Sequence, residues 1–521
     1  MARSWIGVLL LLSGAVTLAA ACSEIGGSSS SSRGASGPPN PGAPAPAGTG
    51  GGVSTSVGTG GGQDFAAFRQ ALDQMRIPSP DTLDEAGFFA EHYTSLPAPT
   101  CDQTLCLHGM LSVSPDNVHG GQWTLLQMGM NSPVDPASVA KPPLDLVVVL
   151  DRSGSMAEAG KMVYAKQGID LLIDALTGSD TLTLVAFDST AHTLFGPARV
   201  TDPVRLKAIV DSVQPGSNTD IYDGLELGYQ AALTAGDETQ QRRVIFLTDG
   251  LHTAGTTDRA AILAMSAIYN MKYVGLTTIG LGSDADLALL RQLSEQGGGN
   301  FYFVEDPSAV TEVFTQELAF FVAPIAYDLQ ITFGELPSYK IKQVYGTNLW
   351  ETTAGGGQLS IPSAFLASRT SAAPDATGGR RGGGAAVIAE LAPTPAHPLV
   401  GPCDVARLHL SYRLPGTTTF EAQDVAVAYD VDDAPSEGAG AFYSSRDIEK
   451  NTIILGLFVA FRDATAAAQL DPSAARSMLT AYQPKLLVSL AGWADQDLLD
   501  DVGILQQYID VLASAPSGHI M

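Results

Sequence analysis

The sequence predicts an α/β fold, in which a doubly wound and mostly parallel sheet occupies residues 143–322. Apolar runs without polar alternation recur through this region, and segments of helical periodicity separate them. Strands of that kind are buried on both faces, which requires helices on both sides of the sheet. The runs lie at Leu144–Leu150, Leu182–Phe187, Val244–Leu247 and Val274–Leu281. A different periodicity before and after this region predicts that the flanking segments are built differently.

The first 22 residues have the composition of an export signal. Arg3 gives a positive start, and the apolar stretch Ile6–Ala21 ends directly before Cys22. This arrangement resembles a bacterial lipoprotein signal peptide, cut before Cys22 and lipidated there. An ordinary secretory peptide cleaved at an A-x-A site and a retained anchor are the alternatives. We favour lipidation, which implies a protein anchored by palmitate-type lipid in the bacterial cell envelope, at the outer membrane or cell surface.

Residues 23–62 form a Ser/Gly/Pro/Ala tract with few apolar side chains. Such a segment cannot bury enough surface to fold, so it is predicted to be a disordered tether, as a surface lipoprotein needs. No later segment offers an uninterrupted apolar span that could cross a bilayer, and we expect no transmembrane helix in the mature chain. Ile453–Phe461 comes nearest, but Glu449, Lys450 and Arg462 bound it closely.

Residues 63–142 combine a helical pattern with strands. Apolar residues recur at helical steps in Gln63–Tyr93, where two prolines break the helix, and strand-like alternation follows within Leu105–Met130. Cys101 and Cys106 lie in a loop between them and predict a local disulfide bond in an exported protein. Cys403 could instead pair with either one.

After residue 322 the apolar period changes to two, which is typical of half-buried antiparallel strands. Residues 323–435 are therefore predicted to be β-sandwich-like, joined by the strands near residues 105–130, with the α/β region inserted between them. Residues 436–521 have helical patterns and predict a C-terminal helical region of two or three helices.

Three segments bring hydroxyl and carboxylate oxygens to one edge of the predicted parallel sheet. The first apolar run ends in Asp151-Arg152-Ser153-Gly154-Ser155, a later run ends in Asp249, and Thr219 lies in a loop between them. The carboxyl ends of parallel strands form the edge at which open α/β sheets bind ligands. Hydroxyl and carboxylate oxygens are hard ligands that suit Mg²⁺. A lone turn of this type could be structural, but all three segments together predict a metal site.

Together these motifs resemble the metal-ion-dependent adhesion site of the von Willebrand factor type A (vWA) domain, a Rossmann-like fold. The resemblance implies that Ser153, Ser155 and Thr219 bind the metal directly or in exchange for water. It implies that Asp151 and Asp249 lie close behind, often through water. The expected ion is Mg²⁺, with Mn²⁺ or Ca²⁺ as alternatives. The N-terminal region is similar in spacing to that of bacterial vWA lipoproteins of the YfbK-like group.

Three nearby residues have less specific roles. Asp220 and Asp223 are expected to cap the helix that follows them rather than to add charge at the metal. For Asp188, both a capping role and a position on the metal face stay open. The resemblance also implies a short antiparallel edge strand at Thr193–Phe195.

The composition excludes one class of partner. The chain has 54 acidic and 28 basic residues among 521, and its net charge is −26. No cluster of Lys and Arg in the sequence could neutralise phosphates, so we expect no nucleic-acid binding. The negative charge is interpreted as a solubility feature of an exposed protein.

The metal motif predicts a binding module. A protein ligand would supply an Asp or Glu carboxylate that completes the coordination of the cation. The alternative function is a non-adhesive structural or assembly scaffold of the envelope, whose metal site stabilises or regulates it. Metal-assisted hydrolysis would need a positioned general base as well, so we expect that the protein is not an enzyme.

Overall fold

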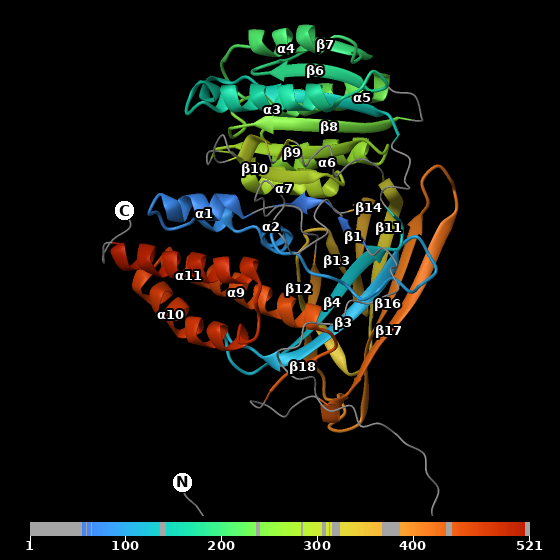
Figure 1. The fold of residues 1–521 in the computed structure, drawn as a ribbon, viewed down its shortest axis with the longest axis vertical. Coiled ribbons are helices and arrows are strands. Elements are labelled where there is room, and N and C mark those ends of the chain that lie inside the picture. Colours follow the sequence, from blue (N-terminus) through green and yellow to red (C-terminus); the bar gives the residue numbers. More distant parts are fainter. Residues whose placement is uncertain are drawn as a thin grey trace, which may run out of the picture. The chain divides into compact units, whose positions relative to one another are not determined.

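The computed structural model describes residues 55–58, 60–63, 65–135, 142–235, 240–282, 285–304, 309–311, 313–314, 324–366, 386–433 and 440–515. The predicted signal peptide, the lipidation site Cys22 and residues 23–54 of the predicted tether lie outside these residues. Two sheets and two groups of helices make up the described part of the chain (Figure 1).

Seven strands form the mostly parallel sheet that the sequence predicts, and Figure 1 shows several of them side by side. In spatial order they are β2 (Gly61–Gly62), β10 (Asn300–Val304), β9 (Gly275–Leu281), β8 (Gln241–Thr248), β5 (Leu144–Asp151), β6 (Thr181–Phe187) and β7 (Ala191–Arg199). All neighbours are parallel except β6 and β7. The antiparallel edge strand expected at Thr193–Phe195 is therefore confirmed within a longer strand.

Helices cover both faces of this sheet because the side chains of each buried strand alternate between two cores. In β5, Val148 packs in one core with α3 and α4, while Val149 packs in the other core with α5, α6 and α7. The bounds are α3 (Lys161–Ala175), α4 (Pro203–Ser212), α5 (Ile221–Ala235), α6 (Arg259–Asn270) and α7 (Leu287–Gln296). The predicted doubly wound α/β fold is confirmed.

The second sheet is antiparallel and contains eleven strands. Its strands are β1 (Thr55–Gly58), β3 (Cys106–Pro115), β4 (Gln122–Ser132), β11 (Pro324–Glu335), β12 (Tyr339–Tyr345), β13 (Trp350–Thr353), β14 (Gly356–Leu366), β15 (Val387–Pro393), β16 (Pro402–Arg413), β17 (Phe420–Asp430) and β18 (Phe442–Tyr443). β4 pairs with β15, so strands on both sides of the parallel region in sequence join one sheet. A Cβ atom on Gly109 of β3 would lie 2.4 Å from Val427 of β17, which shows that the sheet packs against itself as a sandwich does.

A helical group joins the two ends of the described chain, and Figure 1 shows its N-terminal part (blue) beside its C-terminal part (red). Phe65, Phe68 and Phe88 share one core with Phe458 and Phe461. The helices are α1 (Ala66–Asp73), α2 (Glu85–Ala90), α9 (Arg446–Ala468), α10 (Pro472–Ser489) and α11 (Gln496–Ser514). By length and composition alone α9 could span a membrane, with a mean hydropathy of 1.2, but 78% of that window is buried as in a core helix.

The predicted C-terminal boundary of the tether, at residue 62, is wrong. Thr55–Gly58 pairs with both β4 and β14, and Gly61–Gly62 pairs with β10. These residues carry few apolar side chains, and they join the sheets through backbone hydrogen bonds instead. A prediction based on side-chain patterns therefore assigns them to the tether.

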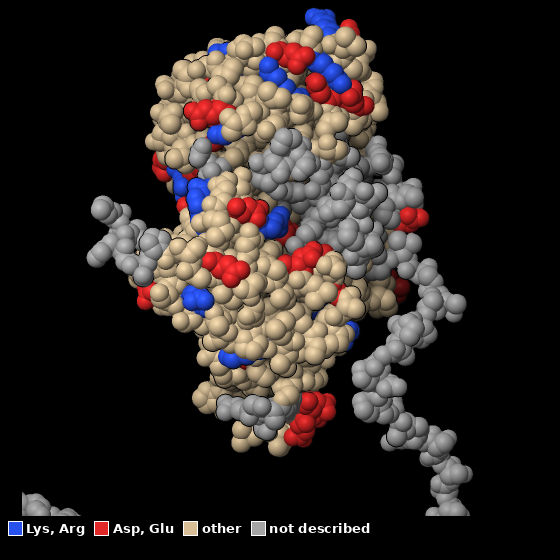
Figure 2. Space-filling model, turned by 60° about the vertical axis from the view of Figure 1, so that its left-hand side comes forward, with Lys and Arg blue, Asp and Glu red and all other residues tan. Residues whose placement is uncertain are grey.

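The cysteines follow the sequence-based expectation of a local disulfide bond. Cys101 and Cys106 form the predicted disulfide bond, and Cys403 is a buried free thiol. On the face shown in Figure 2, Lys and Arg side chains lie singly or beside acidic ones.

Candidate metal centre

The five predicted metal-site residues come from three segments at the carboxyl edge of the parallel sheet. Asp151 ends β5, Ser153 directly precedes a short 3₁₀ turn (Gly154–Ala157), and Ser155 lies within that turn. Asp249 follows β8, which is the parallel neighbour of β5, and Thr219 precedes α5. Because the strands are adjacent and parallel, their ends carry these side chains to the same place.

The hydroxyl groups and Asp249 form one connected cluster. The Oγ atoms of Ser153 and Ser155 lie 3.1 Å apart. Ser155 donates a hydrogen bond to Asp249 Oδ1 at 2.9 Å, and Ser153 lies 3.4 Å from the same oxygen. A Cβ atom on Gly250 would lie 3.6 Å from Thr219 Oγ1 and 3.7 Å from Ser155 Oγ, so Thr219 borders the same space.

Asp151 orients the segment that carries Ser153 through hydrogen bonds. Its Oδ1 accepts a hydrogen bond from the Ser153 backbone N–H at 2.7 Å, and its Oδ2 accepts one from the Thr248 hydroxyl at 2.5 Å. Asp151 is fully buried, and this burial raises its pKa to about 6. A buried carboxylate whose charge is costly favours a nearby cation.

Backbone hydrogen bonds hold the loops together. Gly154 N–H donates to the Ser217 carbonyl at 2.8 Å, and Gly216 N–H donates to the Arg152 carbonyl at 2.5 Å. On the other side, Thr219 N–H donates to Thr253 Oγ1 at 2.9 Å. The positions of the hydroxyl groups therefore depend on main-chain contacts and not only on their own rotamers.

The donor set suits a hard divalent cation. Three hydroxyl oxygens lie beside two buried carboxylates, and such oxygens are preferred by Mg²⁺ and related ions. Within the described residues no group of three or more His, Cys, Asp or Glu could hold a metal. A cation at this edge would therefore be bound by hydroxyl and carboxylate oxygens together. The residues that would bind it are Ser153, Ser155, Thr219, Asp151 and Asp249.

The neighbouring acidic residues have structural partners. Asp188 forms an ion pair with Arg152 at 2.7 Å, which gives it a role at the rim of the site. Asp220 accepts a hydrogen bond from Asp223 N–H and so caps the start of α5, as expected. The expectation for Asp223 is wrong, because its side chain accepts from Ala191 N–H at 2.6 Å and holds β7 instead.

Sequence reasoning did not identify three residues of the site. Lys161 forms an ion pair with Asp249 at 2.8 Å, Thr248 binds Asp151, and Thr253 binds the Thr219 backbone. A signal existed for Lys161, since it opens a helix, where acidic residues are preferred. No pattern in the sequence identifies Thr253, whose contact depends on how the loops fold.

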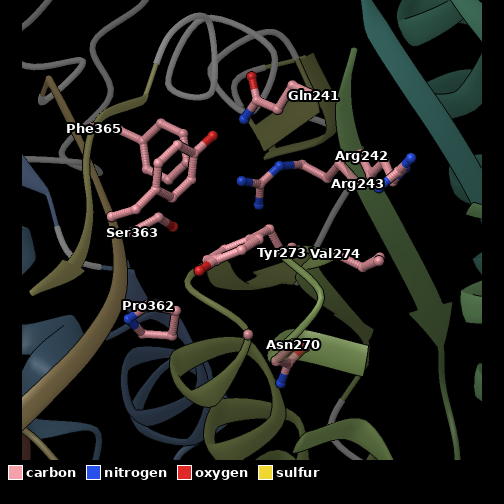
Figure 3. A pocket seen from close by; sticks show the side chains of 12 residues that line it. Gln241, Arg242, Arg243, Asn270, Tyr273, Val274, Pro362, Ser363 and Phe365 are labelled. Carbon is pink, nitrogen blue, oxygen red and sulfur yellow. The ribbon is translucent and has the colours of Figure 1, made fainter. Parts of the chain in front are cut away.

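A small cavity lies at the opposite edge of the sheet from the metal-site residues, near the amino ends of β8 and β9 (Figure 3). Arg243 extends over the ring of Phe365, with its guanidinium carbon 5.2 Å from the ring centroid. The cavity measures about 20 Å³, which is room for little more than one water molecule. It is therefore a packing feature and does not compete as a ligand site.

Comparison with known proteins identifies the parallel region. Residues 146–252 match the family model of the von Willebrand factor type A domain. The chain is 25% identical over 292 residues to the uncharacterized protein YfbK of Escherichia coli (strain K12), covering 54% of this chain and 49% of that protein. It thus spans about half the length of this relative. The match to the family model supports a vWA domain in the region that contains the five site residues.

Among solved structures, the chain is matched to the von Willebrand factor type A protein from Catenulispora acidiphila. It is 16% identical with a TM-score of 0.47, and the match covers 80% of this chain and 90% of that one. Proximal thread matrix protein 1 from the mussel byssus, solved with a zinc-occupied MIDAS motif, is 19% identical with a TM-score of 0.30. That match covers 34% of this chain and 47% of the mussel protein.

Proposed function

We propose that the protein is a lipid-anchored component of the bacterial cell envelope whose vWA domain captures a protein ligand in a manner dependent on a divalent cation. The ligand supplies an Asp or Glu carboxylate. When bound, Mg²⁺ or a related ion would offer a coordination position to that carboxylate. The observation that carries the proposal is the meeting of Ser155 and Asp249 from two strand ends, with Thr219 beside them.

The exposure of the site supports recognition of a large partner. The carboxylates of Asp151 and Asp249 are fully buried, while Gly154, Ser217 and Leu251 around them are exposed. An exposed rim around a buried charged centre allows another protein to approach the hydroxyl groups. The exposed rim is therefore the side from which a ligand carboxylate would approach the site.

The hydrogen bonding supports binding rather than catalysis. Asp151 accepts two hydrogen bonds, and Asp249 accepts from Ser155 while it pairs with Lys161. A general base needs a carboxylate that can reach a substrate proton, and these groups are engaged within the protein. We therefore propose a non-enzymatic role.

Metal binding tests the first part of the proposal. Isothermal titration of the full chain with Mg²⁺, and separately with Mn²⁺, Ca²⁺ and Zn²⁺, should show one saturable site. Ser155→Ala should weaken Mg²⁺ binding by about tenfold or more, since it removes a direct oxygen. Ser217→Ala is the matched control, because its exposed hydroxyl bonds to Ser189 while its carbonyl continues to hold Gly154.

Ligand capture tests the second part. Immobilised protein should retain a partner from envelope and extracellular fractions in Mg²⁺, and chelator, Asp151→Ala or Ser155→Ala should release it. Retention that persists in chelator would favour the alternative, an envelope scaffold whose metal site is structural. For the anchor, fatty-acid labelling in a bacterial host should be lost with Cys22→Ser, and labelling that persists would contradict lipidation at this residue.

A further inference from the structure

We propose that Lys161 is a built-in counter-ion of the metal centre, which lowers its affinity for the cation and leaves the loaded site with a positive charge for the ligand's carboxylate. This inference rests on the proposed function. It assigns the strength of metal binding and the preference for an anionic partner to one residue outside the predicted donor set.

The ion pair between Lys161 and Asp249 is buried on both sides. Lys161 Nζ lies 2.8 Å from Asp249 Oδ2, and the side chains are 8% and 0% exposed. The stem of the lysine is also confined, because a Cβ atom on Gly282 would lie 3.0 Å from its Cε. An ammonium group held in this way cannot swing into solvent, as surface lysines do.

The two oxygens of Asp249 are divided between different partners. Oδ1 accepts from the Ser155 hydroxyl, whereas Oδ2 is bound by Lys161. Lys161 therefore binds the oxygen of Asp249 that the serine hydroxyl does not contact. It opposes the charge of Asp249 and leaves Oδ1 among the hydroxyl groups.

The position of Lys161 in its helix supports a role at the site. Lys161 is the first residue of α3, and the preceding Gly160 adopts a left-handed conformation. A cation in the first turn is unfavourable, because the helix dipole places partial positive charge there. The ion pair with Asp249 compensates for the unfavourable interaction of Lys161 with the helix dipole. An acidic residue would interact favourably with the dipole at this position.

The charges of the site explain the effect. Asp151 and Asp249 carry two negative charges, and the ammonium group of Lys161 places one positive charge against Asp249. The charges of Arg152 and Asp188, which form an ion pair nearby, cancel each other. When a divalent cation is bound, the charge of Lys161 adds to that of the cation and favours a carboxylate from a ligand. Without the lysine, the protein's own carboxylates would neutralise the cation and the pull on an outside anion would decrease.

Lys161→Met tests the inference, because methionine retains most of the side-chain volume and removes the charge. Titration of the full chain with Mg²⁺ or Mn²⁺ at constant ionic strength should show metal binding about tenfold tighter or more than in wild type. Lys166→Met is the matched control. It removes a lysine that lies in the same helix and donates a hydrogen bond to the Asp211 carbonyl. Its metal affinity should equal that of wild type.

Acetate is the probe for the ligand carboxylate. At constant ionic strength, added acetate should strengthen metal binding by wild type and should do so less in Lys161→Met. Equal or weaker metal binding by a folded Lys161→Met protein would overturn the inference while wild-type binding upholds the proposed function. If Lys161→Met fails to fold, Lys161→Gln is judged by the same criterion. Absence of metal binding by wild type would overturn the proposed function and this inference together.

Discussion

Ser155 and Asp249 are 94 residues apart in the sequence, yet the Ser155 hydroxyl donates a 2.9 Å hydrogen bond to Asp249 Oδ1. The contact exists because β5 and β8 are adjacent and parallel, with Leu150 paired to Leu247 one step before the site. Asp249 directly follows the end of β8, and Ser155 lies in the short 3₁₀ turn that follows β5. Such support fixes the positions of oxygen donors without help from a ligand.

Gly250→Ala should separate the fold from the metal site. The added methyl would make ordinary contacts, at 3.6 Å from Thr219 Oγ1 and 3.7 Å from Ser155 Oγ, and Gly250 does not need a left-handed backbone. We expect a free energy of unfolding within about 1 kcal/mol of wild type. Mg²⁺ affinity should fall about tenfold, because the methyl narrows the space beside both hydroxyls. Denaturation and titration calorimetry measure the two effects, and unchanged affinity would place the cation elsewhere.

Glu85 should make stability depend on pH. Burial raises the pKa of Glu85 to about 8, although its Oε1 accepts a 2.8 Å hydrogen bond from Gly346 N–H. Between the ordinary value near 4.5 and about 8, the folded protein holds a proton that the unfolded chain releases. The free energy of unfolding should therefore fall as the pH rises through this range, on the order of 1 kcal/mol per unit at most.

Glu85→Gln tests this expectation, since the amide retains an acceptor for Gly346 and cannot ionise. Its stability relative to wild type should increase from pH 5 to pH 8 and then level off, as measured by urea denaturation at each pH. Glu351→Gln, at an exposed position of β13, controls for the loss of a formal charge. A constant difference between Glu85→Gln and wild type across the range would contradict the assignment.

Two glycine substitutions should have opposite effects on stability. A Cβ atom on Gly228 of α5 would lie 2.5 Å from Val149 Cγ2, so Gly228→Ala should force α5 away from β5 and cost about 1–3 kcal/mol. Gly503 of α11 is exposed with no atom near its Cβ position, and Gly503→Ala should stabilise by about 0.5–1 kcal/mol. Thermal or urea denaturation checks both, and a stabilising Gly228→Ala would contradict the packing described here.

The sequence predicts the parallel sheet well because its strands are buried on both faces. Leu144–Leu150 and Val244–Leu247 carry an unbroken apolar signal, and both are strands of the seven-stranded sheet. The grouping of Asp151 with Asp249 follows from the same signal, since parallel strands end at one edge. The expectation that Ser153 and Thr219 lie near them came from the resemblance of the three motifs to the vWA metal site.

Other features could not be predicted because no side-chain pattern expresses them. Gly61 and Gly62 join the sheet through backbone pairing alone. The contact between Lys161 and Asp249 depends on the exact approach of α3 to the end of β8. The side chain of Asp223 meets Ala191 instead of its own helix, because β7 folds back over the start of α5.

Thr55–Gly58 is bonded between β4 and β14, and from Gly61, three residues after Gly58, the chain is bonded to β10. Mechanical tension that enters through the residues before Thr55 would therefore be taken up by the antiparallel sheet before it reaches the parallel one. The hydrogen bonds of β1 would share that load along the strand, so the vWA-like region would be shielded from pulling at the amino-terminal side.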